Sequence, residues 1–578
     1  MIESFSDLIP YYSWLYIPVA LLTVLSAVEY RRNGSLFCSR REKTVSLIFG
    51  AAFVLFYASG LVLSSGAFLT GKSITFILIS CCLFSAAIGI AYHYVNLFLE
   101  KQFEVKEGSE YWLSRYPLIF SSLIMMVCWL PVFLALYPGL FAYDVANQIP
   151  QTVGHSNTNH ALLHTYYLKA FYNLGREIGS YNTGMAASVI VQMLIFALSL
   201  AYSIQYLVQR HVRKVLVIGV LIFFSIVPIF PILAVSMTKD ILFTAAFIAS
   251  FVKILELNEN GFQSYRIWDW AEILVFFVLT AMLRNNGQYA VFAVLAAFFV
   301  KSLFNRKNIK YAYVLAVTTV LLISVSNNVL MAVTKAVPGT KNQMLSLPYQ
   351  QLSRVYKYDH AVFSKEDEAS VKRLIPKAGH YNEHRSDAVM WSATVFNSRE
   401  NQKLFARIYF EYLLKKPLRY LEAFLINTSG FWYLDDISSP QMYGKLPHGI
   451  RDDFGLFLMD TKPGFGVTHE SKLQWLDDLI KALFHENKYQ NFPVIASIFN
   501  MGTYFWLLVL SVFYCIQVKN NKAIVPLFFV LAYTATLFAG PCALFRYALS
   551  FIVCIPAFWV TVYSKKLPQT SSNPSAAA

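Results

Sequence analysis

The residues best suited to chemistry lie in one stretch, which runs from Tyr137 to Thr165 and reads YPGLFAYDVANQIPQTVGHSNTNHALLHT. It holds one carboxylate, Asp144, and three histidines, His155, His160 and His164. A carboxylate placed just past an apolar segment can serve as a general base toward an acceptor hydroxyl. Partial burial at a membrane surface is expected to raise its pKa toward a useful value. The structural alternative is that Asp144 caps a helix beginning at VANQIPQ.

His160 and His164 are four residues apart, so on a helix they would share one face. Such a pair could bind a phosphate, donate to a sugar hydroxyl or ligate a metal. The adjacent glutamate of a metalloprotease motif is missing, which weakens the metal interpretation. The alternative is that both are ordinary polar residues at a membrane interface. Gln148, in the same stretch, is a further candidate for orienting a sugar.

Three single cations stand at the expected outer ends of apolar spans: Lys239 in SMTKD, Arg284 in LRNNGQ and Arg546 in LFRYAL. Basic residues there oppose the usual preference for the cytoplasmic side, which points to an anionic ligand. A lipid phosphate or diphosphate fits, because arginine can bind it with two parallel hydrogen bonds. The alternative is that each side chain simply reaches the lipid headgroups. Asp240 is expected to cap the next span or to pair with Lys239.

Asn285 and Asn286, which precede Gly287, could hydrogen-bond a sugar or could form an ordinary polar turn. Other function classes find little support. The sequence has no convincing P-loop, GxGxxG or GxSxG motif and no zinc-ligand spacing. The net charge of +15 is assigned to basic loops that fix membrane topology, and no nucleic acid is expected as a partner.

The elements that must position these residues are membrane spans. Of 578 residues, 56% are hydrophobic and only 14% are charged, whereas soluble proteins carry about a quarter charged residues. Continuous apolar runs of about 20 residues predict an all-α polytopic membrane protein. We expect about thirteen spans, at about 11–28, 45–66, 73–97, 117–137, 184–206, 215–236, 241–256, 269–283, 288–304, 311–333, 498–517, 523–540 and 545–563. A proline kink is expected near Pro228 and Pro231.

This count places the N-terminus outside and the C-terminus inside, with the basic loops on one side. The predicted divisions are accessory spans (1–114), a core (115–333, with first outer loop 138–183), a mainly helical extracytoplasmic domain (334–497), C-terminal spans (498–563) and a disordered cytoplasmic tail (564–578). Within the first outer loop, HALLHTYYLKAFYNLGREI predicts an interfacial amphipathic helix with Leu163, Tyr167, Ala170, Phe171 and Leu174 at helical spacing.

Six motifs together resemble an uncharacterised bacterial family of GT-C-like proteins, GT-C being a class of membrane glycosyltransferases: YPGLFAYDVANQ, SMTKDILF, MLRNNGQYA, MLSLPYQQLSRVY, NTSGFWYLDD and LFRYAL. The resemblance covers roughly residues 115–563. It implies that an acid in the first large outer loop, here Asp144, is the catalytic base. It also implies that Arg546, with Arg284 and Lys239, binds the phosphate of a lipid-linked donor. Many GT-C enzymes have a second acid two residues away, where this chain has Ala146, so a divalent metal is not expected as a cofactor.

The function expected from these features is an inverting glycosyltransferase at the outer face of a bacterial cytoplasmic membrane. It would move a sugar from a polyprenyl-phosphate donor to a glycan or lipid acceptor of the cell envelope, among membrane lipids. Gln148, His160, His164, Asn285 and Asn286 would contact substrate. Two alternatives stay open, a transporter or flippase of lipid-linked glycans and a polysaccharide polymerase. A flippase needs polar residues deep in the bundle, whereas here nearly all charged residues fall at span ends.

Overall fold

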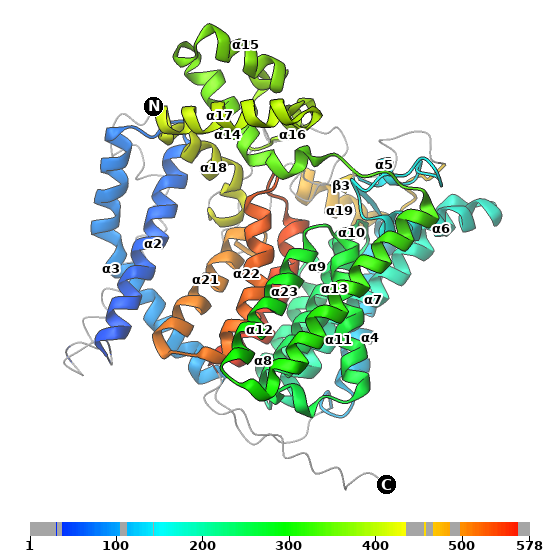
Figure 1. The fold of residues 1–578 in the computed structure, drawn as a ribbon. Helices are drawn as coiled ribbons and strands as arrows, with labels where there is room; N and C mark the ends of the chain where they lie inside the picture. The colour runs from blue at the N-terminus through cyan, green and yellow to red at the C-terminus, as the bar shows by residue number, and fades with distance from the viewer. Residues whose placement is uncertain are drawn as a thin grey trace.

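A computed structural model describes residues 31, 37, 39–103, 112–142, 144–434, 456–457, 466–485 and 497–563. Within these residues the chain is mostly helical, with long helices standing side by side and a smaller body of short helices over one end (Figure 1). The first predicted span, Tyr143 and the predicted disordered tail lie outside the described residues.

A helix occupies each of the other twelve predicted spans. Their bounds are α2 (Arg40–Ser64), α3 (Gly71–Gln102), α4 (Pro117–Ala135), α7 (Tyr181–Gln209), α8 (Lys214–Ile226) with α9 (Ile229–Ala234), α10 (Lys239–Asn260), α11 (Ile267–Leu283), α12 (Gly287–Leu303), α13 (Ile309–Thr334), α21 (Met501–Val518), α22 (Ile524–Phe538) and α23 (Phe545–Tyr563). Among the described residues, eight helical segments are long and apolar enough to cross a membrane. The protein is therefore an α-helical membrane protein. Thirteen crossings and the sidedness of the loops stay predictions.

The predicted kink is a break between two helices. Helix α8 ends at Ile226, and α9 starts again at Ile229 with Pro228 as its N-cap residue. Proline lacks a backbone N–H and its ring clashes with the preceding turn, so it kinks or breaks a helix, and here the helix breaks.

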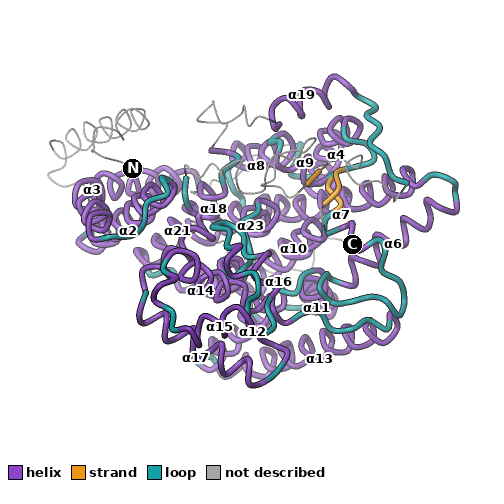
Figure 2. The backbone as a smooth tube through the Cα atoms, turned by 90° about the horizontal axis from the view of Figure 1, so that it is seen from above, coloured by secondary structure: helices purple, strands orange, loops and turns teal. Residues whose placement is uncertain are grey.

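Helix α10 is the centre of the bundle. Nearly all its side chains from Asp240 to Leu257 are buried, and it packs against α7, α11, α22 and α23. Seen from above, α10 lies among these helices, while the α2–α3 hairpin stands at one edge (Figure 2). A helix apolar on all sides belongs in such a core. Its first turn carries Lys239 and Asp240, so the position of α10 fixes where both lie.

A small sheet departs from the all-helical expectation. Its strands are β1 (Leu140–Ala142), β2 (Ser236–Met237) and β3 (Leu456–Phe457), in the order β2-β1-β3. Strand β1 runs parallel to β2, with Leu140 opposite Ser236 and Phe141 opposite Met237. Gly139 is required just before β1, because a Cβ there would meet the Val235 carbonyl oxygen at 2.8 Å and its φ is +136°. Two segments almost a hundred residues apart are thereby joined in fixed register.

The first outer loop contains the short α5 (Val145–Gln148) and the longer α6 (Leu162–Glu177). The predicted amphipathic helix is confirmed. It buries Leu162, Thr165 and Leu168 against the protein, while Leu174 keeps 43% of its exposure. Glycines make the close approach to α7 possible, because a Cβ on Gly184 would lie 2.4 Å from the Phe171 carbonyl oxygen.

The polar segment after α13 forms the body of short helices: α14 (Ser346–Tyr358), α15 (Lys365–Leu374), α16 (Asp387–Ser392) and α17 (Arg399–Lys415). They enclose a separate apolar core that includes Tyr349, Leu352, Ile408 and Tyr412. Figure 1 shows them above the long helices. We call residues 346–415 the polar domain.

The predicted extracytoplasmic domain, 334–497, is divided differently in the structure. Helix α18 (Pro417–Trp432) packs against α14 of the polar domain and also against α2 and α21, with Leu425, Ile426 and Trp432 in one apolar cluster with Val62 and Leu63. Helix α19 (Gln474–His485) packs against α4. Both helices lie within the range predicted for the domain, and each also packs against membrane spans.

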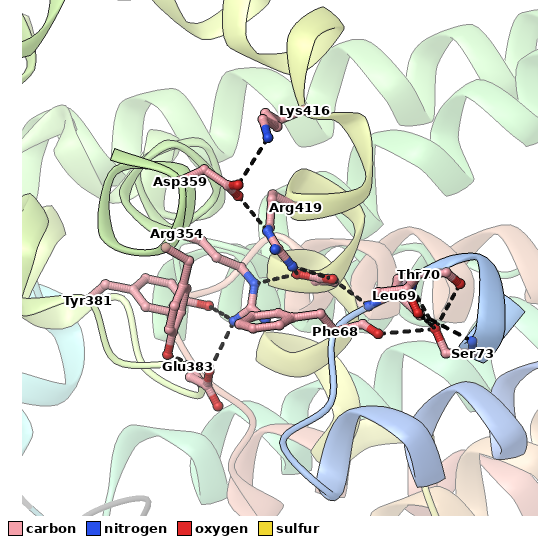
Figure 3. Close-up of polar contacts among 12 residues, drawn as sticks. Phe68, Leu69, Thr70, Ser73, Arg354, Asp359, Tyr381, Glu383, Lys416 and Arg419 are labelled. Carbon is pink, nitrogen blue, oxygen red and sulfur yellow. Dashed lines mark hydrogen bonds and ion pairs between the residues drawn. The ribbon is translucent and has the colours of Figure 1, made fainter. Parts of the chain in front are cut away.

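Buried charges join the polar domain to the loop between α2 and α3 (Figure 3). Glu422 is fully buried, and its carboxylate accepts hydrogen bonds from Arg354 Nε at 2.9 Å, Arg419 Nη1 at 2.9 Å and the Leu69 backbone N–H at 2.6 Å. The Arg419 guanidinium also lies 3.9 Å from the centre of the Phe68 ring. These contacts hold the hairpin against the domain, which gives the accessory spans a structural role.

Candidate functional site

The β1–β2 pairing places Asp144 beside Lys239. Each residue follows the end of its strand by two positions, and the parallel pairing makes the two chain segments leave the sheet side by side. The Lys239 Nζ atom donates to Asp144 Oδ2 at 2.7 Å. The Asp144 side chain keeps 20% of its exposure and Lys239 keeps 14%, so the pair is reachable from solvent.

Two further groups approach the same oxygen. Arg546 Nη1 lies 3.7 Å from Asp144 Oδ2, and His160 Nδ1 lies 3.9 Å from it. His160 Nδ1 is also 3.3 Å from Lys239 Nζ. Asp144 stands at the N-cap position of α5 but makes no side-chain capping bond. The capping alternative is therefore right about the position of Asp144 but not about its carboxylate, which is engaged by cations instead.

Asp240 forms ion pairs with both arginines of the site, Arg284 and Arg546. Its Oδ1 accepts from Arg284 Nη1, and its Oδ2 lies 3.4 Å from Arg546 Nη1. Thr238 connects the same groups, since its hydroxyl accepts from Arg546 Nη1 at 3.0 Å and donates to Asp240 Oδ2 at 2.9 Å. The expected pairing of Asp240 with Lys239 is wrong. Side chains of consecutive helical residues point about 100° apart, so Lys239 faces Asp144 while Asp240 faces the core.

Asp144, Lys239, Arg284 and Arg546 thus meet as expected, and together with Asp240 and His160 they make one connected set that we call the ion cluster. Three permanent cations face two carboxylates in it, which leaves one positive charge when His160 is neutral.

Aromatic rings shape the arginine side of the cluster. The Arg284 guanidinium lies 4.2 Å from the centre of the Tyr547 ring, and the Arg546 guanidinium lies 5.2 Å from it. Arg546 keeps 2% of its exposure, and its Nε has no hydrogen-bond partner among the described residues. The unused N–H of this buried guanidinium can donate to a further oxygen that reaches it.

Helix termini add to the positive potential. Lys239 is the first residue of α10, Arg546 is the second residue of α23, and α12 begins at Gly287 directly after the Arg284 turn. The N-terminus of a helix carries a partial positive charge and unpaired N–H groups, and it favours anions. The ion cluster and these three helix starts together favour an anionic ligand.

The protonation of Asp144 differs from expectation. Burial alone raises the pKa of Asp144, but Lys239 and Arg546 outweigh burial and hold that pKa well below its usual range. The expected raised pKa is wrong for this state of the protein. Burial, with the Lys239 charge acting in the same direction, lowers the pKa of His160 to about 4. His160 is therefore neutral near pH 7.

The two histidines do not share a helix face. Helix α6 begins at Leu162, so His160 lies in the preceding loop while His164 is inside the helix. His164 is fully buried, and its Nδ1 lies 3.3 Å from Gln148 Oε1. Gln148 is also fully buried and donates to Thr165 Oγ1 at 3.0 Å. Burial lowers the pKa of His164 to about 3. Gln148 and His164 thus join α5 to α6 and are not exposed to a substrate.

The remaining candidates lie at the border of the site. Asn285 is exposed and donates to the Thr158 carbonyl at 3.3 Å, while Asn286 is the N-cap residue of α12. The turn interpretation is confirmed for both residues. His155 is exposed. Among the described residues, no group of three or more His, Cys, Asp or Glu side chains is placed to hold a metal ion.

Sequence reasoning missed Thr238 and Tyr547 as members of the site and misassigned Asp240. A signal was present for Asp240, since a carboxylate inside an apolar helix requires a buried cation. Nothing in the sequence shows that Tyr547 stacks on Arg284, because that contact depends on how α23 packs beside α10.

These features define a class: a multi-span α-helical membrane protein with a partly buried, net-positive ion cluster at the ends of its core helices. The chain belongs to the Family of unknown function (DUF6020), whose model matches residues 149–576. The match includes the cations of the ion cluster, His160 and Asp240, and begins five residues after Asp144. No curated protein and no solved structure matches the chain.

Proposed function

We propose that the protein is an inverting glycosyltransferase that takes a sugar from a polyprenyl-phosphate donor and transfers it to a cell-envelope glycan or lipid. The observation that carries the proposal is the ion cluster, in which one accessible carboxylate stands among three cations. A general base beside an anion-binding group is what sugar transfer from a phosphate requires.

The donor phosphate is assigned to Lys239 and Arg546. Lys239 is the most accessible cation of the cluster, and Arg546 has an unused Nε donor. Arg284 is held by Asp240 and by the Tyr547 ring, so its role is to keep Arg546 and Asp240 in place. The N-termini of α10 and α23 strengthen the attraction for the phosphate.

In the reaction, the acceptor hydroxyl gives its proton to the Asp144 carboxylate as its oxygen bonds to the anomeric carbon. The bond from that carbon to the phosphate oxygen breaks, and its electron pair leaves with the polyprenyl phosphate. Lys239 and Arg546 neutralise the charge that develops on the leaving phosphate. Attack from the face opposite the leaving group inverts the anomeric configuration.

The lowered pKa of Asp144 has a consequence for this scheme. A carboxylate held by two cations is a weak base, because its proton affinity is reduced. A bound phosphate competes for Lys239 and Arg546, and the pKa of Asp144 then rises toward its usual range. Donor binding would therefore make Asp144 a stronger base. Without a donor, Asp144 would stay deprotonated and weakly basic.

His160 is the remaining group of the cluster that can touch a sugar. It is neutral, keeps 17% of its exposure and lies beside both Asp144 and Lys239. A neutral imidazole can both accept and donate a hydrogen bond, which suits a sugar hydroxyl. Gln148 and His164 support it indirectly by fixing α5 on α6, and Asn285 and Asn286 form the turn before α12.

The test is sugar transfer by the purified full-length protein in lipid nanodiscs, with a polyprenyl-phosphate sugar as donor and envelope lipid extract as acceptor. We expect transfer by the wild type, and Asp144→Asn to lower kcat by about 10²–10⁴-fold, the range for a general base. Unchanged transfer by Asp144→Asn would remove Asp144 from the mechanism. Passage of intact donor across the membrane without transfer would indicate a flippase, and growth of glycan chains would indicate a polymerase.

A further inference from the structure

Four large apolar side chains are exposed where α17 meets α18. Phe410 keeps 61% of its exposure and Leu414 keeps 82%, both on α17. Leu418 keeps 39% and Leu421 keeps 45%, both on α18. We call these four residues the elbow patch. Those on α17 belong to the polar domain, which lies outside the candidate membrane spans, so lipid around the spans does not by itself explain their exposure.

The elbow is held in a fixed shape. The Tyr420 hydroxyl donates to the Tyr409 carbonyl at 2.9 Å, which ties α18 back onto α17. Asp359, the C-cap residue of α14, accepts from Lys416 Nζ at 3.0 Å and from Arg419 Nε at 2.6 Å, one residue on each side of Pro417 and Leu418 (Figure 3). The patch is therefore presented by a braced corner, and its four side chains cannot easily turn inward.

The position of the patch relative to the membrane follows from α18. Leu425 and Ile426 pack in one cluster with Val62 and Leu63, which lie in the last turn of the candidate span α2. At 1.5 Å per residue, Leu421 stands about 6 Å and Leu418 about 10 Å farther along α18 than Leu425. The headgroup layer on each side of a bilayer is about 5–8 Å thick. The patch therefore stands where the hydrocarbon of the bilayer gives way to headgroups.

The side chains along α17 agree with this depth. Lys403 and Arg407 share the outward face of α17 with Phe410 and Leu414, but they lie farther from the elbow, and Arg407 is paired there with Asp367 and Glu411. The face is thus apolar next to the elbow and basic farther along α17. Such an order matches an interfacial segment, whose apolar residues enter the acyl boundary while its cations meet lipid phosphates.

We propose that the elbow patch inserts into the membrane leaflet on the side of the polar domain and anchors that domain to the lipid surface. The membrane is the occupant because the patch continues the apolar contact of α18 with a membrane span. This anchoring would hold the polar domain at a constant height over the ion cluster, and it does not depend on the proposed transfer reaction.

The test compares two single-cysteine additions on the same helix face, Leu414→Cys in the patch and Lys403→Cys about 16 Å away along α17. The full chain is placed in phosphatidylcholine–phosphatidylglycerol nanodiscs and treated with a sulfonated maleimide that cannot enter the bilayer. Labelling is read as mass added beyond that of the unsubstituted protein, because the chain has seven cysteines of its own. A sample denatured in detergent checks that both added thiols are reactive.

We expect L414C to label at least about tenfold more slowly than K403C, because the acyl boundary excludes the reagent. A photoreactive diazirine residue at position 414 should then form adducts with the nanodisc lipids. Labelling of L414C at about the same rate as K403C would place the elbow in water and overturn the proposal. Slow labelling with adducts to a second protein chain, and none to lipid, would also overturn it, since a protein partner would then cover the patch.

Discussion

Replacing Asp240 and replacing Asp144 should have opposite consequences, although both carboxylates belong to the ion cluster. Asp240 is fully buried between Arg284 and Arg546, whereas Asp144 keeps 20% of its exposure. Asp240→Asn removes the charge that neutralises two buried guanidinium groups. Asp144→Asn removes a charge that solvent already screens in part, and the asparagine oxygen can still accept from Lys239.

The magnitudes follow from these positions. At the 3.4 Å separation of Arg546 Nη1 and Asp240 Oδ2, an effective dielectric constant of about 20 gives an attraction of about 5 kcal/mol before desolvation. Removing one partner of a buried ion pair costs about 3–5 kcal/mol, since the other charge stays buried and unpaired. For the partly exposed Asp144–Lys239 pair, the cost is about 1 kcal/mol. Asp240→Asn should therefore destabilise the protein by about 2–4 kcal/mol more than Asp144→Asn.

The assay is the free energy of unfolding in mixed micelles, titrated with a denaturing detergent and followed by tryptophan fluorescence. Sugar transfer by the same preparations is measured in parallel. The reasoning requires Asp240→Asn to be the unstable variant and Asp144→Asn to be a stable but inactive one. If Asp144→Asn unfolds more easily than Asp240→Asn, or if neither differs from the wild type, the assignment of Asp240 as the buried counter-ion is refuted.

Three further predictions concern the elements around the site. Glu422→Gln should lower the free energy of unfolding by about 1.5–3 kcal/mol, because it removes the buried carboxylate shared by Arg354 and Arg419, which then keep only Glu383 and Asp359 as acidic partners. The partly exposed Glu411→Gln should cost less than about 1 kcal/mol, and equal effects would argue against the hairpin anchor. Gly184→Ala should lower the free energy of unfolding by about 1–3 kcal/mol, since its Cβ would meet the Phe171 carbonyl. Gly219→Ala, where the added Cβ has open space, should be neutral or slightly stabilising. A harmless Gly184→Ala would mean that α6 and α7 are not so close. His160 has a folded pKa of about 4, below its usual value, so the unfolded chain takes the proton first and stability falls as pH drops from about 6.5 to 4. His160→Gln should reduce this slope by up to about 1.4 kcal/mol per pH unit, and an unchanged slope would contradict the burial of a neutral His160.

The membrane spans were predictable from the sequence, because an apolar run of about 20 residues rarely forms anything other than a spanning helix. Helix α4 begins at Pro117 and α23 covers Phe545–Tyr563, as the sequence indicated. The meeting of Asp144 with Lys239, Arg284 and Arg546 was also foreseen from their common position at span ends. That argument needs only the sidedness of the chain and the shared length of the spans.

What could not be predicted depends on packing between distant segments. The β1–β2 pairing that brings the segments of Asp144 and Lys239 together involves only a few residues, too few for a recognisable pattern of alternation. The packing partners of α18 could not be predicted, because its sequence is amphipathic. Which of its faces is buried depends on the presence of α2 and α21. The pKa of Asp144 was misjudged since its sign depends on whether burial or the two cations prevail, which requires distances.

The central claim is that the ion cluster binds an anionic phosphate in competition with Asp144. The most direct measurement is the binding of farnesyl phosphate, a short polyprenyl phosphate without a sugar, to the full-length protein in nanodiscs. Arg546→Gln should weaken this binding by about tenfold or more, because a charged hydrogen bond to the phosphate is lost. Asp144→Asn should strengthen binding several-fold, about 1 kcal/mol, because the carboxylate that competes for Lys239 and Arg546 is removed. If Asp144→Asn weakens binding, or if neither substitution changes it, the phosphate does not bind where we place it.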